Sequence, residues 1–129
     1  MPTITITTTK LSTARRRAVA VRLTRWLSTH GSERGHVVVR FESTEEGTVY
    51  IGGMPVEALP YDDGLRHAAV TCCVAPDRDE AYRAALAAEI GDALGLTAGT
   101  PFLYVEFRPT PLDQVHYGAA GKLRRADAT

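Results

Sequence analysis

The feature that most constrains this chain is an internal repeat with an offset of about 66 residues. "VVRFE" at 38–42 matches "YVEFR" at 104–108, and "TVYIGG" at 48–53 matches "VHYGAAG" at 115–121. Each half reads as a strand, a helix and a second strand. We therefore predict two copies of one βαβ unit. The copies are expected at about residues 2–53 and 66–121, joined by a linker at 54–65.

The first unit shows the periodicities of a strand followed by a helix. Residues 3–9, "TITITTT", alternate isoleucine with threonine, which is typical of a strand. Ser12 can cap a helix that runs to about residue 28, because apolar side chains recur there at helical spacing. A second strand is expected at 36–42, and a turn with a short hairpin strand at 45–53.

The second unit repeats this order. Asp77 and Glu80 have the spacing of a capping box, and the helix they would begin is expected to end at about Leu94. The other predicted elements are a strand at 67–75, its partner at 102–108, a short hairpin strand at 114–121 and a loose polar tail at 122–129.

The repeat also predicts how the elements pack. One unit alone would leave a face of its strands bare, so the two units should share one sheet. We expect an α+β fold in which a four-stranded mixed sheet carries two helices on one face, with short hairpin strands in addition. A chain of 129 residues is long enough for one domain with an apolar core.

Composition excludes several classes of partner. Lys plus Arg and Asp plus Glu both number 15, so no global charge favours nucleic acid or an anionic membrane. The apolar runs are far shorter than the roughly 20 residues of a membrane span, and no signal peptide precedes the first strand. Cys72 and Cys73 would point to opposite faces of a strand, which disfavours a bridge between them. We expect a reduced, cytoplasmic protein.

The Met-Pro start, the βαβ unit, a hairpin of the "YIGG" type and the tandem repeat together resemble the tautomerase superfamily. "HVVVRFESTEEGTVYIGG" is similar to 4-oxalocrotonate tautomerase. "FLYVEFRPTPLDQVHYGAAG" is similar to the fused subgroup typified by cis-3-chloroacrylic acid dehalogenase. The likeness covers about residues 2–121. It implies a homotrimer, active sites around each N-terminal proline after removal of Met1, and no cofactor or metal.

Pro2 is the first candidate catalytic residue. With Met1 removed, its nitrogen is a secondary amine, and α-amino groups titrate near pH 8. Burial in an apolar pocket lowers the pKa of such an amine, which makes it a competent general base and acid. If Met1 stays, the nitrogen is a tertiary amide with no basic lone pair. The structural alternative is a proline that only begins a strand.

Arg78 is the candidate anchor for a substrate carboxylate. The resemblance places an arginine of this role at the start of the second helix. A guanidinium can fork a carboxylate, and a helix N-terminus adds positive potential. The structural alternative is a surface arginine paired with Asp77 or Asp79.

Several positions depart from the dehalogenase pattern, and three of them concern substrate binding and hydration. The subgroup's second carboxylate-binding arginine falls on Ala75, its water-placing tyrosine on Glu106, and its water-activating glutamate near His116. Glu106 and Arg40 are equivalent in the two repeats. A carboxylate in the otherwise apolar "YVEF" is costly unless paired, so Glu106 is either functional or bound to Arg40 or Arg108. His116 is either an acid near neutral pH or a hairpin residue without a role.

These residues predict a cofactor-independent keto–enol tautomerase that acts on a small carbonyl or enol carboxylic acid. Pro2 would move the proton and Arg78 would bind the carboxylate, while Arg40, Glu106 or His116 would steady the enolate or complete the relay. One alternative is a hydratase, dehalogenase or decarboxylase of an unsaturated or β-keto acid. The other is a trimeric binding module without catalysis.

Overall fold

The computed structural model describes residues 2–128. Four strands and two helices make up its main layer: β1 (Thr3–Thr8), α1 (Thr13–Thr29), β2 (Val38–Ser43), β5 (His67–Val74), α2 (Glu80–Leu94) and β6 (Phe102–Pro109). Four short strands form two hairpins: β3 (Tyr50–Ile51) with β4 (Met54–Pro55), and β7 (His116–Ala119) with β8 (Lys122–Arg125). Single 3-10 turns at Arg34–His36, Val56–Ala58 and Leu112–Gln114 complete the described elements.

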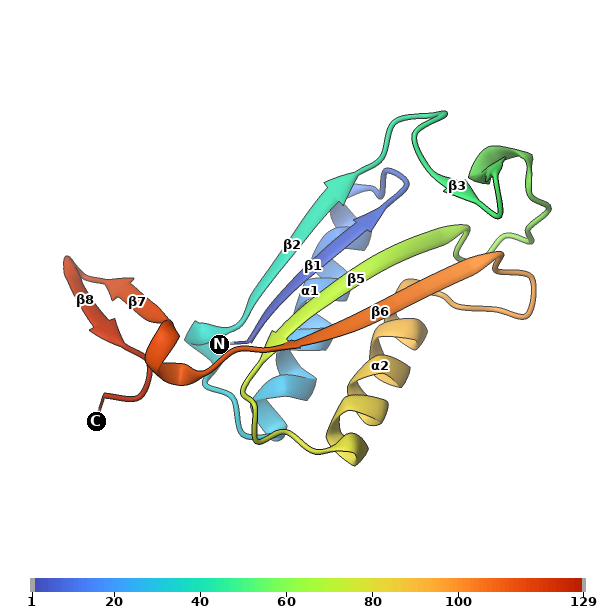
Figure 1. Ribbon diagram of the computed structural model, residues 1–129. Coiled ribbons are helices and arrows are strands. Elements are labelled where there is room, and N and C mark those ends of the chain that lie inside the picture. The colour runs from blue at the N-terminus through green and yellow to red at the C-terminus, as the bar shows by residue number, and fades with distance from the viewer. Residues whose placement is uncertain (1, 129) are drawn as a thin grey trace.

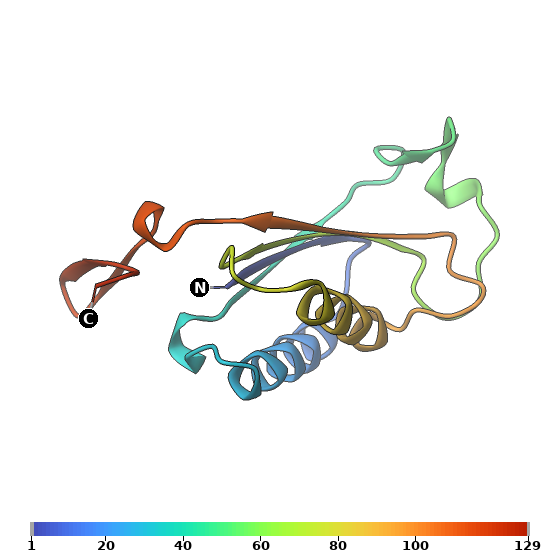
Figure 2. The ribbon, with the colours of Figure 1, turned by 60° about the horizontal axis from the view of Figure 1, so that its bottom comes forward.

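The four long strands form one mixed sheet in the order β2-β1-β5-β6. The outer pairs, β1 with β2 and β5 with β6, are parallel, and the central pair of β1 and β5 is antiparallel. Both helices lie on the same face of this sheet (Figures 1 and 2). The predicted α+β architecture is therefore confirmed.

The strand registers relate the two units by an approximate two-fold axis. Thr5 lies opposite Thr71 across the central pair, and these two residues pair outward with Arg40 and Glu106. The four positions form one row across the sheet. In this row both equivalent pairs differ by the 66 residues predicted from the repeat. Arg40 and Glu106 therefore lie on opposite edge strands, about 14 Å apart at three strand spacings.

The core lies between the sheet and the helices. Each fully buried Leu, Ile or Val stabilises the fold by about 1.5–3 kcal/mol relative to exposure. Alternate residues of β1 and β5 face the helices, and the helices bury one stripe each. The fully buried side chains include Ile4, Ile6, Val19, Leu23, Leu27, Val70, Cys72, Leu86 and Ile90. No described helix is long and apolar enough to cross a membrane.

The two adjacent cysteines lie on opposite faces of β5, as their strand position predicted. Cys72 is buried in the core, and Cys73 is half-buried on the other face. Burial raises the pKa of the Cys72 thiol to about 12, with the neighbouring Cys73 as a smaller cause. Cys72 therefore acts as a small apolar side chain.

One predicted helix cap is confirmed and the other is wrong. Ser12 caps α1, and its side-chain oxygen accepts a hydrogen bond from the backbone N–H of Arg15 at 3.1 Å. The cap of α2 is Asp79, which accepts from the N–H of Tyr82 at 2.8 Å, and not Asp77. A turn closed by the N–H of Arg78 and the carbonyl of Ala75 delays the start of the helix by two residues.

Both hairpins begin within the predicted ranges and extend further along the chain than the sequence predicted. Gly52 and Gly53 have positive φ and form the turn of the first hairpin, so its partner strand β4 lies in the expected linker. Ala120 and Gly121 turn the second hairpin in the same way, so the expected loose tail contains β8. Two successive residues with positive φ make the tight turn that two-residue hairpins require.

Candidate active site

A pocket of about 230 Å³ lies where β1 begins. Its walls come from the end of α1, the segment between β5 and α2, and the C-terminal hairpin. The lining residues are Pro2, Gly31, Ser32, Glu33, His36, Val74, Ala75, Asp77, Arg78, Tyr82, Leu112, Tyr117 and Ala126. The pocket therefore brings together Pro2 and Arg78, which lie far apart in the sequence.

Pro2 is buried at the end of the central strand β1. Its carbonyl accepts a hydrogen bond from the N–H of Val38 at 3.1 Å, which ties it to β2. On the other side Val74, at the end of β5, lines the same pocket. The position of the Pro2 ring is thus fixed by the sheet itself. Met1, whose removal the sequence analysis requires, lies outside the described residues.

Arg78 reaches the pocket from the turn before α2 and is half-buried. Within residues 2–128 its guanidinium forms no ion pair, so the pairing with Asp77 or Asp79 that was the structural alternative is absent from the described residues. The guanidinium lies over the Tyr82 ring at 4.9 Å. A β-carbon on Gly31 would lie 3.4 Å from both terminal nitrogens. Arg78 is therefore held in place by packing while its charge is not neutralised by a carboxylate.

Arg78 packs on the Tyr82 ring, and Tyr82 in turn packs against Trp26. The Trp26 and Tyr82 rings meet edge to face with centroids 5.4 Å apart. Burial raises the pKa of Tyr82, and the positive charge of Arg78 partly opposes that rise. The phenol is thus neutral near pH 7. Its ring face can hold the guanidinium by a cation–π interaction.

Two stacked aromatic side chains, His36 and Tyr117, also line the pocket. The His36 and Tyr117 rings stack with centroids 4.1 Å apart, and His36 Nδ1 lies 3.3 Å from the Glu33 carboxylate. The Ser32 Oγ is buried beside the Tyr82 hydroxyl, and this contact also opposes the rise in the pKa of Tyr82.

The sequence did not mark Ser32, His36 or Tyr82 as site residues. For Tyr117, which matches Tyr50 across the repeats, it predicted a role as a wall or packing residue rather than as a proton donor. The one sequence signal for Ser32 is the preceding Gly31, which marks the end of α1. Because α1 ends at the pocket, the residue after this glycine lies in the pocket wall. His36 and Tyr117 are brought together by the C-terminal hairpin, and this contact leaves no local pattern in the sequence.

The structure places Arg40 and Glu106 on the helix-free face of the sheet, away from the Pro2 pocket of the same protomer. Glu106 accepts hydrogen bonds from Arg108 Nε at 2.6 Å and from the Tyr104 hydroxyl at 2.7 Å. The bond from Arg108 and then the bond from Tyr104 lower the pKa of Glu106, so the carboxylate stays ionised. Arg40 pairs with Glu42 at 3.1 Å.

His116 begins β7 and is exposed, while the adjacent Tyr117 lines the pocket. Side chains at successive strand positions point to opposite faces, so His116 and Tyr117 of one hairpin do not share a surface. Within the protomer, the candidate set therefore divides into Pro2 and Arg78 at the pocket and three residues outside it.

Several solved structures share this architecture. The fused 4-OT wild type asymmetric trimer is 15% identical, with a TM-score of 0.67 over 93% of this chain and 94% of that chain. N1, a member of the cis-3-chloroacrylic acid dehalogenase family, is 18% identical, with a TM-score of 0.68 over 97% of this chain and 85% of that one.

A third structure is Pt0534 inactivated by 2-oxo-3-pentynoate, which is 21% identical, with a TM-score of 0.65 over 92% of this chain and 93% of that chain. No family model and no curated protein matches the sequence. At these identities the comparisons establish the fold, which is that of the 4-oxalocrotonate tautomerase and cis-3-chloroacrylic acid dehalogenase structures. The resemblance predicted from the sequence is confirmed at that level.

Proposed function

We propose that this protein is a cofactor-independent tautomerase of small carbonyl or enol carboxylic acids. The observation that carries the proposal is that Pro2 and an Arg78 without a carboxylate partner line one small pocket. The first would be a base once Met1 is removed, and the second would be an anion anchor. Their combination suits a substrate whose acidic carbon lies close to a carboxylate.

The proposed reaction moves one proton. The neutral Pro2 amine takes the proton from the carbon beside the carbonyl, and the electron pair moves onto the carbonyl oxygen as an enolate. The ammonium of Pro2 then returns the proton to oxygen or to the conjugated carbon. Arg78 would bind the carboxylate by charge-assisted hydrogen bonds.

The protomer places three further candidates outside its own Pro2 pocket: Arg40, Glu106 and His116. They would take part in the reaction only if they reached the Pro2 pocket of a neighbouring subunit. The helix-free face of the sheet supports such an assembly. It exposes Val38 and Tyr104 by 53% and 46%, in a layer that one protomer leaves uncovered (Figure 2). We propose a homotrimer, as in the fused 4-OT trimer. A mass in solution of about three times the 14.0 kDa of one chain would support it.

The first experiment combines intact mass with labelling of the untagged protein by 2-oxo-3-pentynoate. Loss of Met1 and a single adduct on the Pro2 peptide are expected, because a secondary amine adds to an activated alkyne and the carbanion takes up a proton. Arg78→Met should slow the labelling, since the carboxylate loses its anchor. Retained Met1, or equal labelling of a Pro2→Ala variant, would overturn the proposal and favour a binding module.

A further inference from the structure

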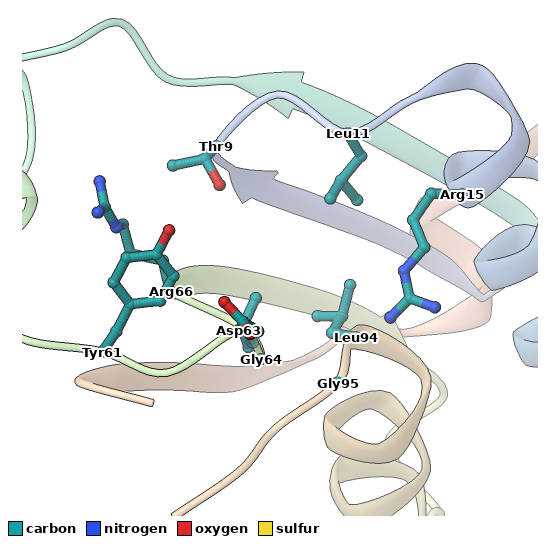
Figure 3. Close-up of a pocket in the computed structure, with 10 residues that line it drawn as sticks. Thr9, Leu11, Arg15, Tyr61, Asp63, Gly64, Arg66, Leu94 and Gly95 are labelled. Atoms are coloured by element: carbon teal, nitrogen blue, oxygen red, sulfur yellow. The ribbon is translucent and has the colours of Figure 1, made fainter. Parts of the chain in front are cut away.

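A second and larger hollow lies at the opposite end of the sheet (Figure 3). Its volume is about 490 Å³, and it lies between the start of β5, the end of β1 and the C-terminal end of α2. The lining residues are Thr9, Leu11, Arg15, Tyr61, Asp63, Gly64, Leu65, Arg66, Leu94 and Gly95. We call it the Arg66 pocket.

The Arg66 pocket is the counterpart of the Pro2 pocket under the internal repeat. The Pro2 pocket uses the start of β1, the end of α1 and the segment after β5; the Arg66 pocket uses the start of β5, the end of α2 and the segment after β1. In each, an arginine covers the glycine that follows a helix. A β-carbon on Gly95 would lie 3.2 Å from Arg15, much as one on Gly31 would lie 3.4 Å from Arg78.

Two cations face this pocket without a carboxylate partner. Arg15 donates one hydrogen bond to the carbonyl of Ala93 at 3.1 Å. The Arg66 guanidinium lies 4.0 Å from the Tyr61 ring centroid, and its buried Nε has no hydrogen-bond partner among residues 2–128. Neither arginine forms an ion pair in that range. Guanidinium groups without a carboxylate partner can donate charge-assisted hydrogen bonds to an anionic ligand.

The wall of the pocket is built by a clamp between two loops. The N–H of Leu65 donates to the carbonyl of Gly95 at 2.8 Å. Asp62 accepts from the Thr97 hydroxyl and from the N–H of Gly64, and these bonds lower the pKa of its carboxyl group. A β-carbon on Gly64 would lie 2.5 Å from Thr97, so the close approach requires glycine. The hollow is thus formed without a ligand.

The charges of the lining residues select a ligand with one negative charge. Figure 3 shows Arg15 and Arg66 on opposite sides of the hollow and Asp63 between them. Within this lining, two positive charges and one negative charge leave a net charge of +1. Arg66 also borders a neighbouring hollow lined by Glu46 and Glu57. A second carboxylate on the ligand would meet Asp63 and be repelled. Leu11, Leu65 and Leu94 supply an apolar surface for a short alkyl chain.

We infer that the Arg66 pocket binds a small aliphatic monocarboxylate, with its carboxylate on Arg15 or Arg66 and its alkyl chain on the leucines. We expect no catalysis of the kind proposed for Pro2 here, because Ala68, which matches Pro2 under the 66-residue offset, has a peptide amide nitrogen. The inference does not depend on the chemistry proposed for Pro2, since none of the residues that carry it lines the Pro2 pocket.

The test is a titration of the isotope-labelled protein with butyrate and with succinate, followed by backbone amide chemical shifts. Butyrate should shift the amides of residues 61–66 and 93–96 and bind more tightly than succinate. Arg66→Met and Arg15→Gln should each weaken this binding by about tenfold. The matched control is Arg17→Gln, an exposed arginine of the same helix outside the pocket, which should leave it unchanged.

Asp63→Asn gives the sharper result, because it should raise the affinity for succinate more than that for butyrate, by about threefold or more. Unchanged shifts at the Pro2 pocket in each variant would show that the fold is kept. The inference is overturned if butyrate shifts only residues of the Pro2 pocket. It is also overturned if Arg66→Met and Arg15→Gln bind butyrate as the wild type does, or if Asp63→Asn leaves the preference unchanged.

Discussion

The two ends of the sheet use the same βαβ plan for different purposes. At one end Pro2 directly precedes β1, and removal of Met1 would turn its nitrogen into an amine in a pocket of about 230 Å³. At the other end β5 follows a loop, so every backbone nitrogen near Arg66 is an amide in a pocket of about 490 Å³. Both ends keep an arginine against the glycine that ends a helix.

Under the two proposals each end of the sheet binds an anion, and only one end holds a base. The two arginines are not copies of one position, because under the 66-residue offset Arg78 matches Ser12 and Arg15 matches Ala81. A free secondary amine depends on where the chain starts and cannot be copied by tandem fusion. The proposed catalysis therefore belongs to one end, and the other end can only bind.

The largest effect should come from converting the Pro2 nitrogen into an amide, so that the Pro2 pocket, like the Arg66 pocket, has no free backbone amine. A lysine inserted between Met1 and Pro2 prevents the removal of Met1, because a large residue then follows the methionine. The Pro2 nitrogen therefore stays in a peptide bond and cannot act as a base. We expect kcat/KM for an enol carboxylic acid to fall by about 10²–10⁴-fold, the usual contribution of a general base. Steady-state kinetics measures this, with circular dichroism to confirm the fold. Turnover at the wild-type rate would exclude Pro2 as the base.

The next effect separates the two arginines. Arg78→Met should lower kcat/KM by about 10–100-fold, because a charged hydrogen bond to the carboxylate contributes about 1.5–3 kcal/mol. Arg15→Met, at the equivalent helix, should leave turnover unchanged.

The matched substrate for this prediction is the methyl ester of the same acid. With the ester the Arg78→Met effect should largely disappear, because no carboxylate is left to anchor. An equal loss with acid and ester would instead assign Arg78 a structural role.

A third effect concerns the glycines that the arginines cover. Gly31 and Gly95 have φ values of +96° and +86°, where an alanine costs about 1–2 kcal/mol. Thermal unfolding of Gly31→Ala and Gly95→Ala should show similar losses of stability. Only Gly31→Ala should also raise KM, since the new methyl group would contact Arg78. If KM rose in both variants, the proposal that only the Pro2 pocket catalyses the reaction would be wrong.

The sequence predicted the sheet, both main helices and the two-fold relation because these depend on periodicity and on the repeat. It misplaced the cap of α2, since the turn from Ala75 to Arg78 is closed by a backbone hydrogen bond that no side-chain pattern marks. It also shortened both hairpins, because "GG" and "AG" were taken as strand ends and not as turns between paired strands.

For the site, the sequence singled out Pro2 and Arg78, which the structure brings to one pocket. It could not supply His36 or Tyr82, because their places depend on tertiary packing between the hairpin, α1 and α2. It also missed the Arg66 pocket altogether. Helical periodicity alone places Arg15 on a solvated face, and only the fold shows that its guanidinium reaches the carbonyl of Ala93 near the end of α2.

The smallest effect concerns His67, the first residue of β5, at the end of the sheet where the Arg66 pocket lies. It is 2% exposed, and neither ring nitrogen has a hydrogen-bond partner among the described residues. Burial lowers the pKa of His67 below its ordinary 6.5, with the positive charge of Arg66 adding to this and Glu57 opposing it. The unfolded chain therefore binds the proton more readily than the folded one.

It follows that the free energy of unfolding should fall as the pH drops below about 6.5, and that His67 should not affect it above neutral pH. Urea unfolding of His67→Leu between pH 7.5 and pH 5, values chosen to span the ordinary histidine pKa, should show a flatter pH dependence than the wild type. His116→Gln, which alters an exposed histidine, is the matched control and should keep the wild-type slope. If the free energy of unfolding depended on pH equally in the wild type and both variants, the burial of His67 would not disfavour its protonation in the folded protein.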